Sequence, residues 1–107
     1  QVSFLLTGDI EGPAMRRMLN QGIDLKADVL KVPHHGAKLK DDGEEFAKAV
    51  SPKISVISVA RRNHYGHPAE QTLDFLNSLP DQRIYRTDQE GAIQIVSDGF
   101  KVQKLDI

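Results

Sequence analysis

Short apolar runs alternate with amphipathic segments along most of the chain. The runs are rich in β-branched and large aliphatic side chains, a pattern typical of strands covered on both faces. The segments between them repeat apolar residues every three or four positions, which indicates helices with one buried face. The pattern predicts strands at 2–7, 28–32, 53–59 and 82–87, and helices that begin at 13, 42 and 68 and end near 21, 50 and 79.

Two further strands, at 92–96 and 100–105, flank Asp98-Gly99, a dipeptide favoured in two-residue hairpin turns. A chain of 107 residues fits one domain, residues 1–107. The order βαβαβαβββ predicts an α/β fold with about three helices and a C-terminal β-hairpin. We expect the hairpin to add antiparallel edge strands, which makes the predicted sheet mixed.

Polar loops follow three of the predicted strands. They read Thr7-Gly8-Asp9, Pro33-His34-His35-Gly36 and, at 63–68, Asn-His-Tyr-Gly-His-Pro; the last two contain all four histidines. Ligands of open α/β sheets bind beyond the carboxyl ends of the strands. A carboxylate and several imidazoles at one such edge can converge on a metal ion, so the loops predict a hydrolytic metal site or part of one.

Composition excludes several other kinds of protein. Lys+Arg is 14 and Asp+Glu is 15, so the net charge of -1 offers no global case for nucleic-acid binding. Without cysteine there is no disulfide framework and no thiolate zinc site. The apolar runs are far shorter than the ~20 residues of a membrane span. Because the chain begins at Gln1 within a strand pattern, we expect it to be a piece of a longer protein.

Asp9 follows a strand and a glycine, a position where a carboxylate can bind one metal ion or bridge two. Residue type alone favours a different role, because aspartate is a common helix N-cap and Pro13 follows closely. Glu11 is interpreted as a solvated surface residue.

The histidine doublet, His34 and His35, follows a buried strand. Neighbouring side chains of an extended segment point to opposite faces, so one imidazole could bind a metal ion while the other contacts substrate or backbone. Gly36 permits a sharp turn beside them. The alternative is a pair of exposed loop histidines.

The loop before the third helix offers further candidates. His67 could bind a metal ion, act as an acid or base or contact phosphate, and it could equally serve only to hold the loop. Tyr65 could stack on a ligand, although half-buried packing under the loop is favoured. Asn63 is favoured as a turn former over a substrate contact.

Basic residues lie in two of these loops: Arg61 and Arg62 in one, Lys38 and Lys40 in the other. Together they could hold phosphate groups near the histidines. A solvated run of loop charges is the simpler interpretation. Asp88 is interpreted as a turn former before Gly91.

Five segments taken together resemble the C-terminal part of the metallo-β-lactamase-like domain of ComEC proteins, the DNA-uptake channel proteins of natural competence. The segments are 4–9, 27–36, 57–59, 65–68 and 85–93. They occur in the same order as in the family, and the resemblance runs over nearly the whole chain. The resemblance implies a four-layer αβ/βα sandwich of two similar halves, with this chain as the second half.

The resemblance also implies roles for single residues. Asp9 corresponds to the bridging metal ligand, and the doublet carries the last metal histidine, with His35 favoured as the ligand and His34 as a substrate contact. His67 becomes a catalytic or phosphate-binding residue at the rim of the site. The implied substrate and phosphate contacts are Arg61, Arg62, Asn63, Tyr65 and Lys38.

The implied function is a metal-dependent DNA phosphodiesterase that degrades the strand not imported. Its implied partners are DNA, the N-terminal half of the domain and the segments of a membrane channel. The parent is expected in the cell membrane with this domain outside the cytoplasm. Alternatives are another phosphoesterase of the same superfamily, or a non-catalytic module that binds DNA or a partner through its basic loops.

Two departures from the family pattern limit what this segment can do alone. The family's main His-x-Asp/His-x-Asp-His ligand cluster is absent, and Ala37 stands where a serine usually follows His-His-Gly. We expect two Zn²⁺ or Mn²⁺ ions in the intact domain. The isolated segment is expected to bind no metal tightly and to be inactive or weakly active.

Overall fold

A four-stranded parallel sheet forms the centre of the molecule. The computed structural model describes residues 1–106, and Ile107 lies outside the described part. The strands are β1 (Phe4–Leu6), β2 (Val29–Lys31), β3 (Ile54–Ile57) and β4 (Arg83–Arg86), and they lie in the order β1-β2-β3-β4. All three strand pairs are parallel, so the four carboxyl ends meet at one edge.

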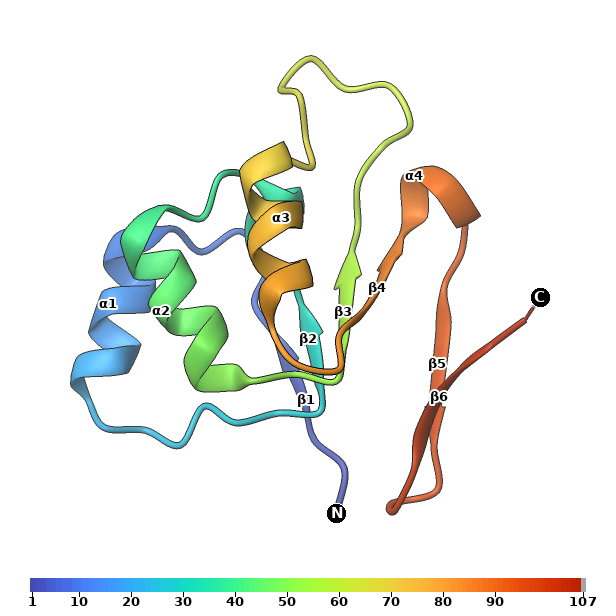
Figure 1. Ribbon diagram of the computed structural model, residues 1–107, viewed down its shortest axis with the longest axis horizontal. Coiled ribbons are helices and arrows are strands. Elements are labelled where there is room, and N and C mark those ends of the chain that lie inside the picture. The colour runs from blue at the N-terminus through green and yellow to red at the C-terminus, as the bar shows by residue number, and fades with distance from the viewer. Residues whose placement is uncertain (107) are drawn as a thin grey trace.

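Three helices connect the strands. They are α1 (Gly12–Asn20), α2 (Lys40–Val50) and α3 (Glu70–Ser78), and Figure 1 shows them together on one side of the sheet. The predicted order of strands and helices is confirmed. The boundaries differ, because α2 begins two residues earlier than predicted and α3 begins two residues later. Two short helical segments, η1 (Pro33–Gly36) and α4 (Thr87–Glu90), follow β2 and β4.

Two apolar clusters attach the helices to the sheet. Phe46 of α2, fully buried, packs with Met15 of α1 and Leu30 of β2. Leu76 of α3 packs in the second cluster with Ile57 of β3. Burying an aliphatic or aromatic side chain contributes roughly 1.5–3 kcal/mol, so these contacts account for much of the cohesion of the helical layer.

The C-terminal hairpin is separate from the central sheet. Within residues 1–106, β5 (Gln94–Ser97) and β6 (Val102–Leu105) pair antiparallel with each other, as a two-stranded sheet of their own. The prediction of one mixed sheet is therefore wrong. The reason is local: β4 runs directly into α4, and Gly91, with φ 74°, then redirects the chain. Figure 1 shows the hairpin beyond β4, away from α1 and α2.

The face of the sheet opposite the helices is apolar near its β1 edge. Strand register places Phe4 and Leu6 on this face with Val29 and Ile54, whereas Leu5 points to the helices and contacts the first core cluster. Phe4 is 46% exposed and Leu6 is 77% exposed. Parallel sheets are normally covered on both faces, so this surface is unusual for a protein in contact with water.

No helix among residues 1–106 combines the length and the apolarity needed to cross a lipid bilayer.

Candidate functional site

The predicted site residues lie together at the carboxyl edge of the sheet. Asp9 follows β1, the doublet His34-His35 lies in η1 after β2, and His67 lies in the loop after β3. Because the strands are parallel and adjacent, their following loops emerge side by side. The site thus depends on three segments that are far apart in sequence.

The backbone of the doublet is left-handed. His34 has φ 53° and ψ 46°, and His35 has φ 56° and ψ 28°. The expectation of an extended segment with alternating side chains is therefore wrong. The His34 amide donates to the carbonyl oxygen of Gly8 at 3.0 Å, which ties η1 to the loop that carries Asp9. Non-glycine residues in this conformation cost about 1–3 kcal/mol each and cluster at functional sites.

His35 is oriented by a hydrogen bond from one ring nitrogen. Its Nδ1 lies 2.7 Å from the carbonyl oxygen of Ser58, which has no proton to give, so Nδ1–H is the donor. In the neutral ring the lone pair is then on Nε2, and Nε2 lies 3.4 Å from Oδ1 of Asp9. Metal-binding histidines are commonly oriented in this way, with the distal ring nitrogen donated to a carbonyl.

His34 lies near both His35 and His67. Its ring centroid is 6.4 Å from that of His35 and 5.9 Å from that of His67. Its Nδ1 lies 3.7 Å from Oε1 of Glu11. Glu11 is exposed, as expected, but it also contributes negative charge to the cluster, which the sequence interpretation did not assign to it.

Asp9 does not cap α1. The N-cap residue is Glu11, without a side-chain hydrogen bond to the helix, and the Asp9 carboxylate is 67% exposed beside His35. The N-cap role that residue type favoured is therefore wrong, and Oδ1 of the carboxylate lies 3.4 Å from Nε2 of His35 instead.

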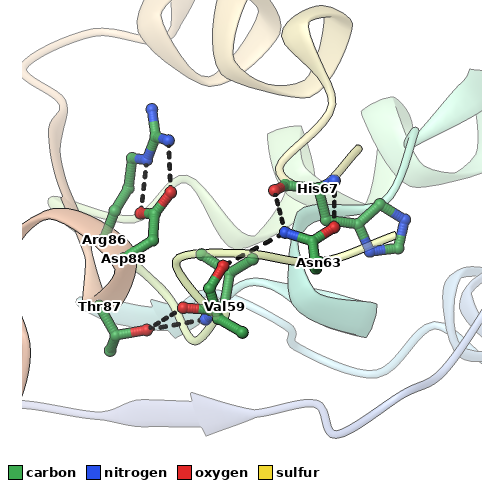
Figure 2. A network of polar contacts seen from close by, with 7 residues as sticks. Val59, Asn63, His67, Arg86, Thr87 and Asp88 are labelled. Atoms are coloured by element: carbon green, nitrogen blue, oxygen red, sulfur yellow. Dashed lines mark hydrogen bonds and ion pairs between the residues drawn. The ribbon is translucent and has the colours of Figure 1, made fainter. Parts of the chain in front are cut away.

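His67 is held by Asn63. Its amide donates to Oδ1 of Asn63 at 2.9 Å, and its carbonyl oxygen accepts from Nδ2 of Asn63 at 2.8 Å; Figure 2 shows both bonds. Burial lowers the pKa of His67 below its ordinary value of 6.5, and the electrostatic effect of the nearby His34 and His35 imidazoles lowers it further. His67 is therefore kept neutral at physiological pH.

The side-chain amide of Asn63 is fully used within its loop. Nδ2 also donates to the carbonyl oxygen of Ala60 at 3.2 Å, and Oδ1 also accepts from the amide of Tyr65 at 3.2 Å. These four bonds support the turn-forming role over the substrate contact that the family resemblance implies for Asn63. A new partner would have to displace one of these bonds.

Tyr65 is 80% exposed, so the prediction of half-buried packing is wrong. Its ring stacks on that of His67, with centroids 5.6 Å apart and an interplanar angle of 29°. Packing is prevented because the loop at 60–66 projects away from the sheet (Figure 1), leaving little for the ring to pack against. An exposed tyrosine stacked on a site histidine remains available to a ligand.

Gly36 allows η1 to approach the loop after β3. Its φ is 79°, and a Cβ atom added here would lie 2.7 Å from Cβ of Pro68 and 3.1 Å from Cγ2 of Ile57. Its carbonyl oxygen accepts from the amide of Ala69 at 2.8 Å. This approach brings the doublet and His67 together.

A second group of hydrogen bonds at the same edge of the sheet, made by Thr87 and Arg86, was not identified from the sequence. The hydroxyl of Thr87 donates to the carbonyl oxygen of Val59 and accepts from its amide, both at 2.8 Å (Figure 2). Arg86 binds Asp88 through two hydrogen bonds, of 3.0 and 2.7 Å. Asp88 is thus an ion-pair partner as well as part of the turn. The sequence signal that could have identified the Thr87 contacts was the position of this threonine directly after a strand.

The basic residues surround the histidine cluster without joining it. Arg61, Arg62, Lys38 and Lys40 are all exposed. Arg61 lies near enough to Asp88 to lower the pKa of that carboxyl group, after the larger effect of Arg86. The two lysines line a cavity that His34 also lines.

Among residues 1–106, no group of three histidine or carboxylate side chains is placed to hold a metal ion. Asp9 and His35 together supply two ligand atoms. Structural zinc sites have four protein ligands and catalytic ones have three, so these two residues alone do not complete a metal site.

Two curated proteins match this chain. ComE operon protein 3 of Bacillus subtilis (strain 168) is 43% identical over 93 residues, which are 87% of this chain and 12% of that protein. The uncharacterized protein YcaI of Escherichia coli (strain K12) is 36% identical over 70 residues, 64% of this chain and 9% of that protein. No protein-family profile and no solved structure matches.

The chain is homologous to a segment of the ComE operon protein, and it spans only a small share of both relatives. This finding connects it to the ComE operon and does not extend to the metallo-β-lactamase-like domain that the loops resemble. It carries no information about a hydrolase activity or a metal.

Proposed function

We propose that this chain is the C-terminal half of a metallo-β-lactamase-like domain that hydrolyses DNA during uptake in natural transformation. The observation that supports it best is the meeting of Asp9 and His35 at the carboxyl edge of the sheet, with Nε2 of His35 3.4 Å from Oδ1 of Asp9 and Nδ1 hydrogen-bonded to Ser58. The homology to a ComE operon protein supports the setting in competence.

The two groups are spaced as metal ligands are. Two ligand atoms each about 2.1 Å from a tetrahedral Zn²⁺ ion lie about 3.4 Å apart. Oδ1 of Asp9 and Nε2 of His35 are 3.4 Å apart, beyond the ~2.7–2.9 Å of a good charged hydrogen bond. A divalent ion, Zn²⁺ or Mn²⁺, would supply Lewis acidity and an activated water in the intact domain.

The other residues have separate tasks in this proposal. His34, beside the ligand pair, faces the substrate, and neutral His67 can accept a proton or a hydrogen bond from a phosphate-bound group. Tyr65 keeps the His67 ring in place and offers its hydroxyl to substrate. Arg61, Arg62 and Lys38 attract the phosphate backbone.

The missing ligands belong to a preceding half of the same domain in this proposal. The apolar sheet face with Phe4 and Leu6 supports this, because a second sheet packed there would cover it and could bring a histidine-rich ligand loop to the shared edge. The parent protein is then a membrane channel component with this domain outside the cytoplasm.

Metal binding can be tested on the chain itself. Zn²⁺ titration, followed by the imidazole resonances of uniformly ¹⁵N-labelled protein, is expected to shift Nε2 of His35 at high metal concentration. Asp9→Ala is expected to abolish the shift. His64→Ala is the matched control, since His64 is an exposed histidine of the neighbouring loop, and it should leave the shift unchanged. Equal loss in both variants would contradict the ligand pair.

Activity has to be tested in a longer protein that carries this segment. We expect metal-dependent degradation of single-stranded DNA, lost on Asp9→Ala while DNA binding is retained. Preference for a small phosphodiester over DNA would favour the other phosphoesterases of the superfamily. DNA binding without any metal-dependent cleavage would favour the non-catalytic module.

A further inference from the structure

A cavity next to the histidine cluster has no ligand assigned in the proposed function, although His34 and Lys38, which have roles there, both line it. Its volume is about 490 Å³, and it lies between the start of α1 and the segment that joins η1 to α2. Pockets of 300–1,000 Å³ are the usual size for small organic ligands. His34 lines both this cavity and the candidate metal site, so a ligand here would lie directly beside the reacting group.

The interior of the cavity is apolar. Met15 and Leu39, which are 4% and 5% exposed, lie in its wall together with Pro13 and Pro33. These side chains form no hydrogen bonds, and two of them are rigid rings. Such a surface suits a flat group with little need of hydrogen bonds at its faces.

The rim of the cavity carries two lysines, Lys38 and Lys40, and the carboxylates of Glu11 and Asp42. Asp42 is paired with Arg16 at 2.8 Å, and Glu11 lies beside His34. Lys38 and Lys40 form no ion pair with residues 1–106, although both are at the cavity. Free lysines above an apolar wall match a ligand with an anionic group attached to a planar ring.

We propose that this cavity binds one nucleotide of a single strand next to the bond to be cut, with the base against Met15 and the phosphate at Lys38 and Lys40. The proposal rests on the proposed function for its substrate, DNA. It adds that the strand is held by a base pocket on this chain, in addition to the phosphate contacts of the loops. Base stacking and phosphate contacts of this kind are typical of single-strand binding.

The two methionines of the chain provide an internal control. Met15 lines the cavity, whereas Met18 packs against the same core cluster away from it. With methyl-¹³C methionine and EDTA present, deoxyadenosine 5′-monophosphate is expected to shift the Met15 methyl resonance in a saturable way and leave Met18 unchanged. Deoxyribose 5-phosphate, which lacks the base, is expected to move the Lys38 and Lys40 amides but not Met15.

Lysine variants test the phosphate contact. Lys38→Glu and Lys40→Glu are each expected to weaken nucleotide binding about fivefold, the effect of an exposed ion pair worth ~1 kcal/mol. Lys26→Glu is the matched control, because Lys26 is exposed and precedes β2, at the other end of the sheet. Equal effects of all three variants would contradict a phosphate contact at the cavity.

Three results would overturn the base pocket: no Met15 shift up to the solubility of the nucleotide, equal shifts of Met15 and Met18, or the same Met15 shift with deoxyribose 5-phosphate. Because these measurements exclude metal and need no turnover, they can fail while the metal site is confirmed. They can also succeed where the domain proves inactive.

Discussion

The two histidines of the doublet and the glycine after them all have left-handed backbone conformations. For the histidines this costs free energy, and for Gly36 it is close to free. The glycine is needed for a second reason, because its missing Cβ leaves room for Pro68. Conformation and space together make residue 36 the most constrained position near the site.

Gly36→Ala is therefore expected to be strongly destabilising. The alanine adds left-handed strain of about 1–2 kcal/mol and an overlap with Pro68 of about 1–3 kcal/mol, so the free energy of unfolding should fall by about 3 kcal/mol. Urea unfolding measures this. Gly66→Ala is the control, because Gly66 has φ 69° but nothing within 4 Å of the added Cβ, and it should lose only about 1 kcal/mol. Equal losses in the two variants would mean that Pro68 moves away from the added methyl group, and would contradict the expected overlap.

The ion pair of Arg86 and Asp88 makes stability depend on pH. The hydrogen bonds from Arg86 hold the pKa of Asp88 below its ordinary value of 3.8 in the folded protein. The ionised carboxylate therefore stabilises the fold above pH ~4, and this contribution disappears as the pH falls through the lower, folded-state pKa.

Asp88→Asn is expected to destabilise the protein at pH 7 by about 1 kcal/mol and to have little effect at the lowest pH at which the protein stays folded. Thermal unfolding at a series of pH values tests this. Asp74→Asn serves as the control, since Asp74 is an exposed carboxylate of α3. A difference between Asp88→Asn and the parent that is constant with pH would contradict the ion pair as its cause.

Residue chemistry and position were enough to identify Asp9, His34, His35 and His67 as residues that meet at the carboxyl edge of the sheet. Histidines, a carboxylate and glycines directly after apolar strands mark a ligand edge in any parallel α/β sheet. The conformation of the doublet could not be predicted, because it depends on the hydrogen bond from His34 to Gly8 and on the approach of Gly36 to Pro68. Those contacts join segments that are distant in sequence.

At the scale of elements, the ends of β3 and β4 are joined by one hydroxyl group. Thr87 begins α4 directly after β4, and its two hydrogen bonds fix Val59 just beyond β3. The loop that carries Asn63 and His67 starts from this fixed point. The two hydrogen bonds of Thr87 thus fix the position at which this loop leaves the sheet.

Thr87→Val keeps the shape of the side chain and removes both bonds. Because it leaves the amide and carbonyl groups of buried Val59 without partners, a loss of about 1–3 kcal/mol is expected. Thr87→Ser, which keeps the hydroxyl, should lose much less. Amide hydrogen exchange gives a local measure, because the Val59 amide should exchange faster in Thr87→Val. Unchanged protection of this amide would contradict the hydrogen bonds of Thr87 as the cause.

The order of elements follows from local periodicity, and the placement of the hairpin does not. Short apolar runs and a period of 3.6 residues identified the strands and the long helices of the chain. Whether a terminal hairpin joins a sheet depends on the turn that precedes it, here α4 and Gly91. The ion pair of Lys104 with Glu90 and its position over the ring of Tyr85, 5.3 Å away, then hold the hairpin where it is.

For the whole molecule, the two faces of the sheet differ in what covers them. All three long helices cover one face, and the opposite face exposes Phe4 and Leu6 near the β1 edge. Exposed apolar surface of this kind marks an interaction site or a tendency to associate. In the proposed domain it is covered by the other half, so the isolated chain should associate through it.

Leu5 and Leu6, which are neighbours in β1, point to opposite faces of the sheet. Leu6→Lys places a charge on the open face and should leave the free energy of unfolding within about 0.5 kcal/mol of the parent, as surface substitutions do. It should also reduce concentration-dependent association in analytical ultracentrifugation. Leu5→Lys directs the same charge toward Leu30 and the helices, and should cost at least about 2 kcal/mol. If Leu6→Lys destabilised the chain as much as Leu5→Lys, the open face would be part of the folded core, and a second half would have no surface on which to pack.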